Sequence, residues 1–142
     1  MSPSRHALNE YRQTTIDAGA AYADPHTLIT MLFGGLQERL AIAKGAMLRQ
    51  DWGKKGEAIG KAIDIVAYLQ ACLDKEKGGE LAENLDALYD YIVKCLLAAS
   101  TQNMPESIDE VSGLVREIEQ AWAAIREVAN KHEAPATMGL RA

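Results

Sequence analysis

The sequence contains few of the residues that interrupt or cross-link a chain. Its 142 residues include four prolines and two cysteines. Because proline ends or kinks helices, so few of them leave room for long helical segments. Two cysteines are too few for a small fold held together by disulfides. Cys72 and Cys95 fall within helical patterns, and we expect both to be reduced, buried thiols.

Long apolar stretches are also absent. A membrane-spanning helix needs about 20 consecutive apolar residues, and the sequence has no run of that length. The opening residues, MSPSRHALNEY, lack the apolar centre of a signal peptide. We therefore expect no secretory signal and no direct insertion into a membrane.

Positive charge is not in excess. Fifteen lysines and arginines stand against 20 aspartates and glutamates, which gives a formal net charge of −5. A duplex-binding protein needs a basic stripe to neutralise phosphates, so nucleic acid is not an expected partner. Hydrophobic residues make up 48% of the chain, which suits a single folded domain over residues 1–142.

Recognisable sets of catalytic or metal-binding residues are missing. A di-metal helical bundle needs Glu-x-x-His motifs, and none of the three histidines follows a glutamate by three residues. There is also no Gly-rich phosphate loop and no CxxC pair. We therefore expect no enzyme activity, no cofactor and no metal site. His26 is the one candidate for a helical phosphotransfer histidine, although it falls in the first turn of a predicted helix.

What the sequence does have is helical periodicity. Apolar residues recur every three or four positions over four long segments, the spacing of amphipathic helices. Asp24-Pro25 and Asp51 offer helix starts, Lys77-Gly78-Gly79 closes the second segment, and Asn103 with Glu106 resembles a capping box. The four segments are approximately residues 25–50, 52–76, 80–102 and 103–131.

These segments predict an all-α fold, an antiparallel up-down four-helix bundle with its core over about residues 25–131. The leader, residues 7–21, places Leu8, Tyr11 and Ala18 on one face, and we expect a short, weakly held N-terminal capping helix there. Residues 132–142 show no apolar stripe and are expected to fray.

Two segments carry more apolar residues than one buried face requires. In residues 80–102 the stripe predicted to be buried comprises Leu81, Leu85, Leu88, Ile92, Cys95 and Ala99. A second stripe faces away from it, and residues 52–76 show the same excess. Either these helices touch neighbours on both sides, or the extra residues form a groove that receives a helix from another chain. The candidate groove residues are Ile65, Tyr68, Leu69, Cys72, Tyr89, Val93 and Leu97.

Several stretches, taken in order, resemble the FliS family of flagellin-specific export chaperones. Residues 25–35 (PHTLITMLFGG) resemble the family's opening motif, and residues 76–80 (EKGGE) resemble its central turn. Residues 84–91 (NLDALYDY) resemble its third helix, and Ala121-Trp122 its last. The resemblance covers about residues 8–126, and it departs at Gly34, where the family usually has an acidic residue.

The resemblance implies a cytoplasmic bundle with a movable N-terminal cap, to which Leu8 and Tyr11 would belong. Such proteins bind the disordered C-terminal segment of flagellin, prevent its premature polymerisation and deliver it to a flagellar export gate protein. A flagellar regulator would be a further partner. Two alternatives remain open from the residues: a phosphotransfer domain using His26, and a structural bundle that self-associates through its surplus stripes.

Overall fold

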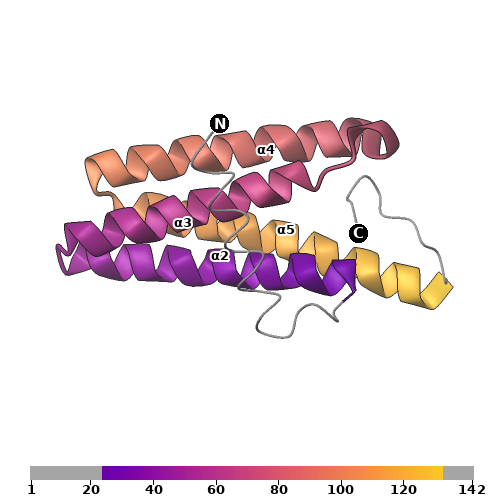
Figure 1. Ribbon diagram of the computed structural model, residues 1–142, viewed down its shortest axis with the longest axis horizontal. Coiled ribbons are helices and arrows are strands. Elements are labelled where there is room, and N and C mark those ends of the chain that lie inside the picture. The colour runs from indigo at the N-terminus through magenta and orange to yellow at the C-terminus, as the bar shows by residue number, and fades with distance from the viewer. Residues whose placement is uncertain (1–23, 133–142) are drawn as a thin grey trace.

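The computed structural model describes residues 24–132, with side chains as far as Ala124, and the described part of the chain is entirely helical apart from its turns. The predicted leader cap over residues 7–21 and the tail beyond residue 132 lie outside the described residues. The four helices (Figure 1) are α2 (Pro25–Leu48), α3 (Trp52–Ala71), α4 (Lys75–Gln102) and α5 (Pro105–His132).

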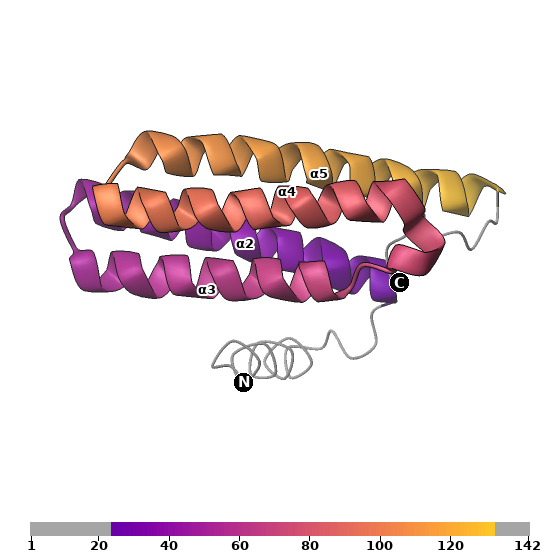
Figure 2. The ribbon, with the colours of Figure 1, turned by 90° about the horizontal axis from the view of Figure 1, so that it is seen from above.

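The helices form an antiparallel up-down bundle, which confirms the predicted fold class. Helix α2 packs against α3 and α5, and α4 packs against the same two helices from the other side. The α2–α3 and α4–α5 turns lie at one end of the bundle, whereas the start of α2 and the end of α5 lie at the other (Figures 1 and 2). Each helix therefore has two neighbours and keeps an outward face.

An aspartate starts each of the first three helices. Helix N-termini leave backbone N–H groups without partners, and a carboxylate just before the helix can accept from one of them. Asp24, Asp51 and Asp74 each accept a hydrogen bond from the N–H three residues further on, at 2.7, 3.2 and 3.1 Å respectively. The predicted starts at Asp24 and Asp51 are thus confirmed.

The boundary between the second and third predicted segments is wrong by several residues. Helix α3 ends at Ala71 and α4 begins at Lys75, because Asp74 caps a new helix before the glycines are reached. Gly79 does not close α3 but kinks α4, with φ 51° and ψ −125°, a conformation that favours glycine. The chain therefore turns twice, at residues 72–74 and again at Gly79.

Asn103 ends α4 rather than capping α5, which corrects the predicted capping box. Its backbone is left-handed, with φ 52°, and its N–H donates to the carbonyl of Ala99. Asparagine tolerates this conformation better than most residues, so it serves well just past a helix end. Its side-chain Oδ1 accepts a hydrogen bond from Lys55 at 2.7 Å, which ties α3 to the α4–α5 turn.

One hydrophobic core runs through all four helices. The helical spacing of the last segment predicts a buried stripe of Ile108, Val111, Val115, Ile118, Trp122, Ile125 and Ala129. This stripe is confirmed as far as its side chains are described, since all of its members from Ile108 to Trp122 are buried. Ile125 and Ala129 of that stripe lie beyond the described side chains. The largest fully buried side chains are Leu32, Phe33, Leu36, Leu40, Ile65, Val66, Ile92, Leu96, Ile108, Val111 and Val115.

Candidate binding surface

Helix α4 is rotated relative to the sequence prediction. Its buried residues are Ala82, Tyr89, Ile92, Leu96 and Ala99. At about 100° per residue, this face is centred roughly 50° from the centre of the predicted stripe, because α4 packs against α3 and α5 at once. The predicted core leucines therefore turn toward the outer edge of the α4–α5 contact.

Three of the seven predicted groove residues lie in the core. The exposed fractions of Ile65, Leu69 and Tyr89 are 1%, 2% and 2%, and all three side chains belong to the hydrophobic core. Burial raises the pKa of the Tyr89 hydroxyl well above its usual value, so that it stays neutral. Their contact with a partner stays a prediction, but they do not form an open surface in this structure.

The other four predicted groove residues are more accessible. Tyr68, Cys72 and Val93 are half-buried and pack against the rim of the core, and Leu97 is 54% exposed on the outer face of α4. Cys72 and Cys95 are not joined in a disulfide, and both are half-buried rather than buried as expected. The predicted second stripe thus reaches the surface mainly at Leu97.

An apolar hollow of about 210 Å³ opens between α4 and α5. Sequence reasoning missed it because its α4 leucines were assigned to the core. The signal that would have found it is Leu114, an apolar residue one position before the buried Val115, which widens the apolar face of α5. The lining residues are Leu81, Leu85, Leu88, Leu114, Glu117, Ile118, Ala121 and Trp122.

Trp122 is fixed at this hollow by His26. The two rings stack with centroids 4.1 Å apart and planes 10° from parallel. Trp122 Nε1 donates to the His26 carbonyl at 3.2 Å, and His26 Nε2 donates to the Trp122 carbonyl at 2.9 Å. This reciprocal pair joins the start of α2 to α5. A phosphotransfer histidine presents its ring to solvent, so the contacts of His26 favour a structural role.

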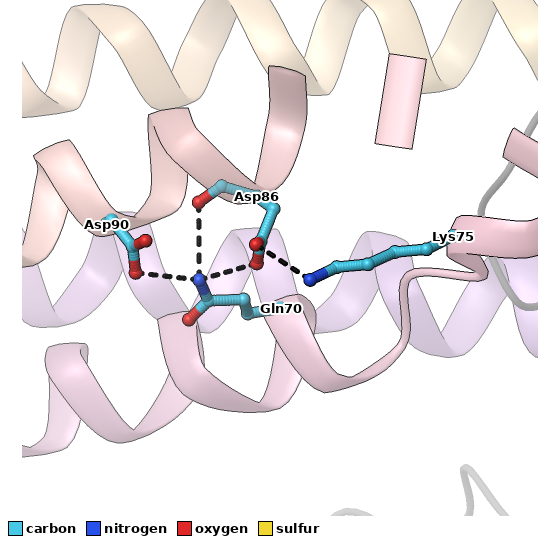
Figure 3. Close-up of polar contacts among 4 residues, drawn as sticks. All are labelled: Gln70, Lys75, Asp86 and Asp90. Carbon is cyan, nitrogen blue, oxygen red and sulfur yellow. Dashed lines mark hydrogen bonds and ion pairs between the residues drawn. The ribbon is translucent and has the colours of Figure 1, made fainter. Parts of the chain in front are cut away.

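A polar cluster holds α4 against α3 behind the Gly79 kink (Figure 3). The side-chain amide of Gln70 donates to Asp86 Oδ1 at 2.7 Å, to the Asp86 carbonyl at 3.2 Å and to Asp90 Oδ1 at 2.8 Å. Lys75 Nζ forms an ion pair with Asp86 Oδ2 at 2.9 Å. The bonds from Lys75 and Gln70 lower the pKa of the Asp86 carboxyl, and Asp86 raises the pKa of Lys75.

The other flank of α5 is polar. A cavity of about 370 Å³ between α2 and α5 lies over buried Leu40 and Ile108. Ser112 Oγ donates to Gln37 Oε1 at 2.6 Å, and the Gln37 amide donates back to the Ser112 carbonyl at 3.0 Å. These groups satisfy one another, and Lys44 and Asp109 in the same lining form an ion pair at 2.9 Å, so the cavity is polar rather than apolar. The apolar hollow is therefore the stronger candidate for binding.

Among the side chains that the structure describes, no group of three or more His, Cys, Asp or Glu is placed to bind a metal ion. No helix within residues 24–132 has the length and apolar character needed to cross a membrane.

Comparisons of the sequence with known proteins show a single family. A sequence model of the family described as "Flagellar protein FliS" matches residues 7–129. Flagellar secretion chaperone FliSB of Pseudomonas aeruginosa is 47% identical over 119 residues, which cover 84% of this chain and 94% of that protein. Flagellar secretion chaperones FliS of Salmonella typhimurium and Vibrio cholerae are 42% and 40% identical, over 89% and 85% of this chain and 94% and 89% of their own lengths.

Proposed function

The chain belongs to the FliS family of flagellar secretion chaperones, and from this premise we propose that it binds the C-terminal segment of flagellin in the cytoplasm. By covering that segment the protein prevents premature polymerisation, and it then delivers flagellin to the flagellar export gate. The activity is binding and escort, without a chemical step.

The apolar hollow between α4 and α5 is the observation that carries this proposal. An amphipathic helix binds to another protein by laying apolar side chains into such a hollow. Leu81 is 39% exposed at one edge of it, while buried Trp122 and Ile118 form part of its wall. Because the hollow is open and apolar, moving a leucine or valine side chain of a partner from water into it lowers the free energy of binding.

A second contact region lies on the outer side of α3 and α4. A segment that folds on binding gives up conformational entropy, so it must bury a large apolar area in return. Leu97 is the most exposed of the predicted groove residues, and Val93 lies one helical turn before it. Tyr68 on α3 and Cys72 just after the end of α3 extend the region. Direct contacts by Ile65, Leu69 and Tyr89 would require a larger opening between the two helices.

The test is a titration of the full chain with the flagellin C-terminal segment, beside a flagellin that lacks the segment. Leu97→Asp should leave the helical circular dichroism unchanged and weaken binding by more than about 1 kcal/mol, as expected for an interface anchor. Its neighbour Leu96 is completely buried, so Leu96→Asp is the matched variant that should disrupt the fold instead.

The proposal also predicts a signal from inside the hollow. In a Trp52→Phe background, Trp122 is the only tryptophan, and its emission should change as flagellin side chains pack against the hollow whose wall it helps to form. A flagellin segment that leaves Trp122 emission unchanged, or full-length and truncated flagellins that bind equally, would contradict the proposal. A dimer of this chain that disappears in Leu97→Asp would support the self-associating bundle instead.

A further inference from the structure

The apolar hollow between α4 and α5 has one charged side chain in its lining. This is Glu117, and the other lining residues are all apolar. Glu117 is exposed, and among the side chains that the structure describes it has no partner for a hydrogen bond or an ion pair. The next residue back, Arg116, lines the polar cavity on the other flank of α5, so its guanidinium is directed away from the hollow. The edge of the hollow therefore carries a carboxylate that can attract a cation.

A second glutamate on the same edge of α5 shows what Glu117 lacks. Glu110 lies seven residues before Glu117, which is about two helical turns, so the two side chains leave α5 in about the same direction. Glu110 Oε2 accepts a hydrogen bond from the Tyr91 hydroxyl on α4 at 3.1 Å. Helices α4 and α5 thus share a polar contact at Glu110, whereas at Glu117 the hollow lies open between them.

Asn84 occupies the position on α4 that corresponds to Tyr91. Helices α4 and α5 are antiparallel neighbours (Figure 2), so a step of seven residues back along α4 matches a step of seven residues forward along α5. These steps lead from the contact between Tyr91 and Glu110 to Asn84 and Glu117. Asn84 is exposed, and no described side chain forms a hydrogen bond with its amide. Two polar side chains from different helices therefore flank the hollow.

A lysine or arginine of a partner matches this combination of an apolar floor and polar edges. Both residues can lay their methylene stem on apolar surface while the charged head stays near water. Leu81 and Leu88 provide such surface, since they line the hollow and lie on the same face of α4 as Asn84. The charged head can then donate to the Glu117 carboxylate and to the side-chain oxygen of Asn84. An aspartate or glutamate in its place would be repelled by Glu117.

We infer that the hollow selects an amphipathic helix that presents a lysine or arginine beside its apolar side chains, and that Glu117 and Asn84 bind this basic residue. The inference rests on the proposed function, under which the helix belongs to the C-terminal segment of flagellin. The apolar side chains supply most of the affinity, because they leave water. The charge pair fixes the register of the helix in the hollow and discriminates against apolar helices that lack the basic residue.

The experiment titrates the full chain with the flagellin C-terminal segment from the same cell, at low and at high salt. Glu117→Gln should leave the helical circular dichroism unchanged and weaken binding about threefold to tenfold at low salt, between the range for exposed ion pairs and that for hydrogen bonds to charged groups. The loss should shrink at high salt, because salt screens exposed charges. Glu110→Gln is the matched control. Its carboxylate is exposed on the same edge of α5 but is already bonded to Tyr91, so the affinity should not change.

Charge reversal identifies the basic residue of the client. Glu117→Lys should weaken binding of the wild-type segment more than Glu117→Gln does, because it brings two cations together. The segment is then varied by replacing its lysines and arginines with glutamate, one at a time. One of these segments should bind the Glu117→Lys chain more tightly than the wild-type segment does, and the same segment should bind the wild-type chain less tightly.

The outcomes separate this inference from the proposed function. If the wild-type chain does not bind the segment, both are overturned. If it binds, this inference alone is overturned when Glu117→Gln binds as tightly as the wild type, when Glu110→Gln weakens binding equally, or when no charge-reversed segment restores binding to Glu117→Lys. It is also overturned if Glu117→Lys abolishes a dimer of this chain, because a second copy would then occupy the hollow.

Discussion

Trp122 connects several properties of this bundle through a single side chain. It is 3% exposed, it stacks on His26, and its indole N–H donates to the His26 carbonyl. It also forms part of the wall of the apolar hollow. The contacts that stabilise the junction of α2 and α5 are therefore the same contacts that shape the candidate binding surface.

Replacing Trp122 should be costly for stability. We expect Trp122→Ala to lower the free energy of unfolding by roughly 3–5 kcal/mol, the usual cost of deleting a large buried aromatic side chain. Trp122→Phe keeps a stacked ring but loses the donor to His26, and should cost only about 1 kcal/mol beyond the change in packing. Urea unfolding followed by circular dichroism measures both values. An unchanged midpoint in Trp122→Ala would contradict the placement of this side chain.

Among the secondary-structure elements, α4 depends most on a special residue. Gly79 has φ 51° and ψ −125°, and no neighbouring atom lies within 4 Å of the position of an added Cβ. A side chain at residue 79 would therefore cost stability through its backbone conformation and not through a clash with neighbouring atoms. Gly79→Ala should destabilise the protein by about 1–3 kcal/mol, the range for a residue forced into a sparsely populated conformation.

Gly60 is the matched control for Gly79. It lies in the interior of α3, is exposed, and also has no neighbouring atom within 4 Å of an added Cβ. Gly60→Ala should raise the free energy of unfolding by about 1 kcal/mol, because alanine has the higher helix propensity. The midpoints of thermal unfolding of the two variants should therefore shift in opposite directions. Equal shifts would show that the backbone conformation at residue 79 does not favour glycine.

The contact between α3 and the start of α4 should depend on pH through Asp86. Its pKa is lowered in the folded protein by Lys75 and Gln70, so its contribution is complete above the unfolded pKa of about 3.9 and is lost as pH falls through the folded pKa. The pKa of Lys75 is raised in the folded protein, so the contribution of Lys75 to stability is present at neutral pH and is lost at alkaline pH, when its ammonium deprotonates. Asp86→Asn should thus be less stable than the wild type at pH 6, and the difference should shrink as the pH falls below about 4.

Denaturant unfolding at several pH values measures that dependence. Lys75→Gln removes the ion pair but leaves the hydrogen bonds of Gln70, so it should reproduce only part of the effect. A difference between Asp86→Asn and the wild type that stays constant from pH 6 to about 2.5 would mean that Asp86 does not contribute through its charge.

The helices themselves could be predicted from the sequence, whereas their rotation could not. Apolar spacing and the aspartate caps locate α2 and the start of α3, because both signals are local. The helix start at Asp74 could not be predicted, because the glycines that follow it are the stronger signal for the end of a helix. The face of α4 that is buried depends on how two neighbours share it, so Tyr89 was assigned to the surface and Leu88 to the core. For the same reason the hollow could not be found from the pattern of one helix.

Considered as a whole, the molecule separates its candidate surfaces along the bundle. The apolar hollow involves the first half of α4 and the middle of α5, whereas Leu97 is exposed in the second half of α4. Between them runs a single core to which all four helices contribute. Because these surfaces are built on one packed unit, occupation of either should stabilise the whole bundle rather than one pair of helices.

This continuity leads to a prediction for the unfolding of the complete chain. A bundle of this size with one core should unfold in a single cooperative transition. Flagellin C-terminal segment present at about 100 times its dissociation constant should add about 2.7 kcal/mol to the free energy of unfolding, which raises the midpoint by roughly 8 °C. Leu97→Asp should melt like the wild type alone but shift less when the same concentration of segment is added, because only binding is weakened. Calorimetry with and without the segment measures both effects, and two separate transitions of which only one moves would show that the halves of the bundle unfold independently.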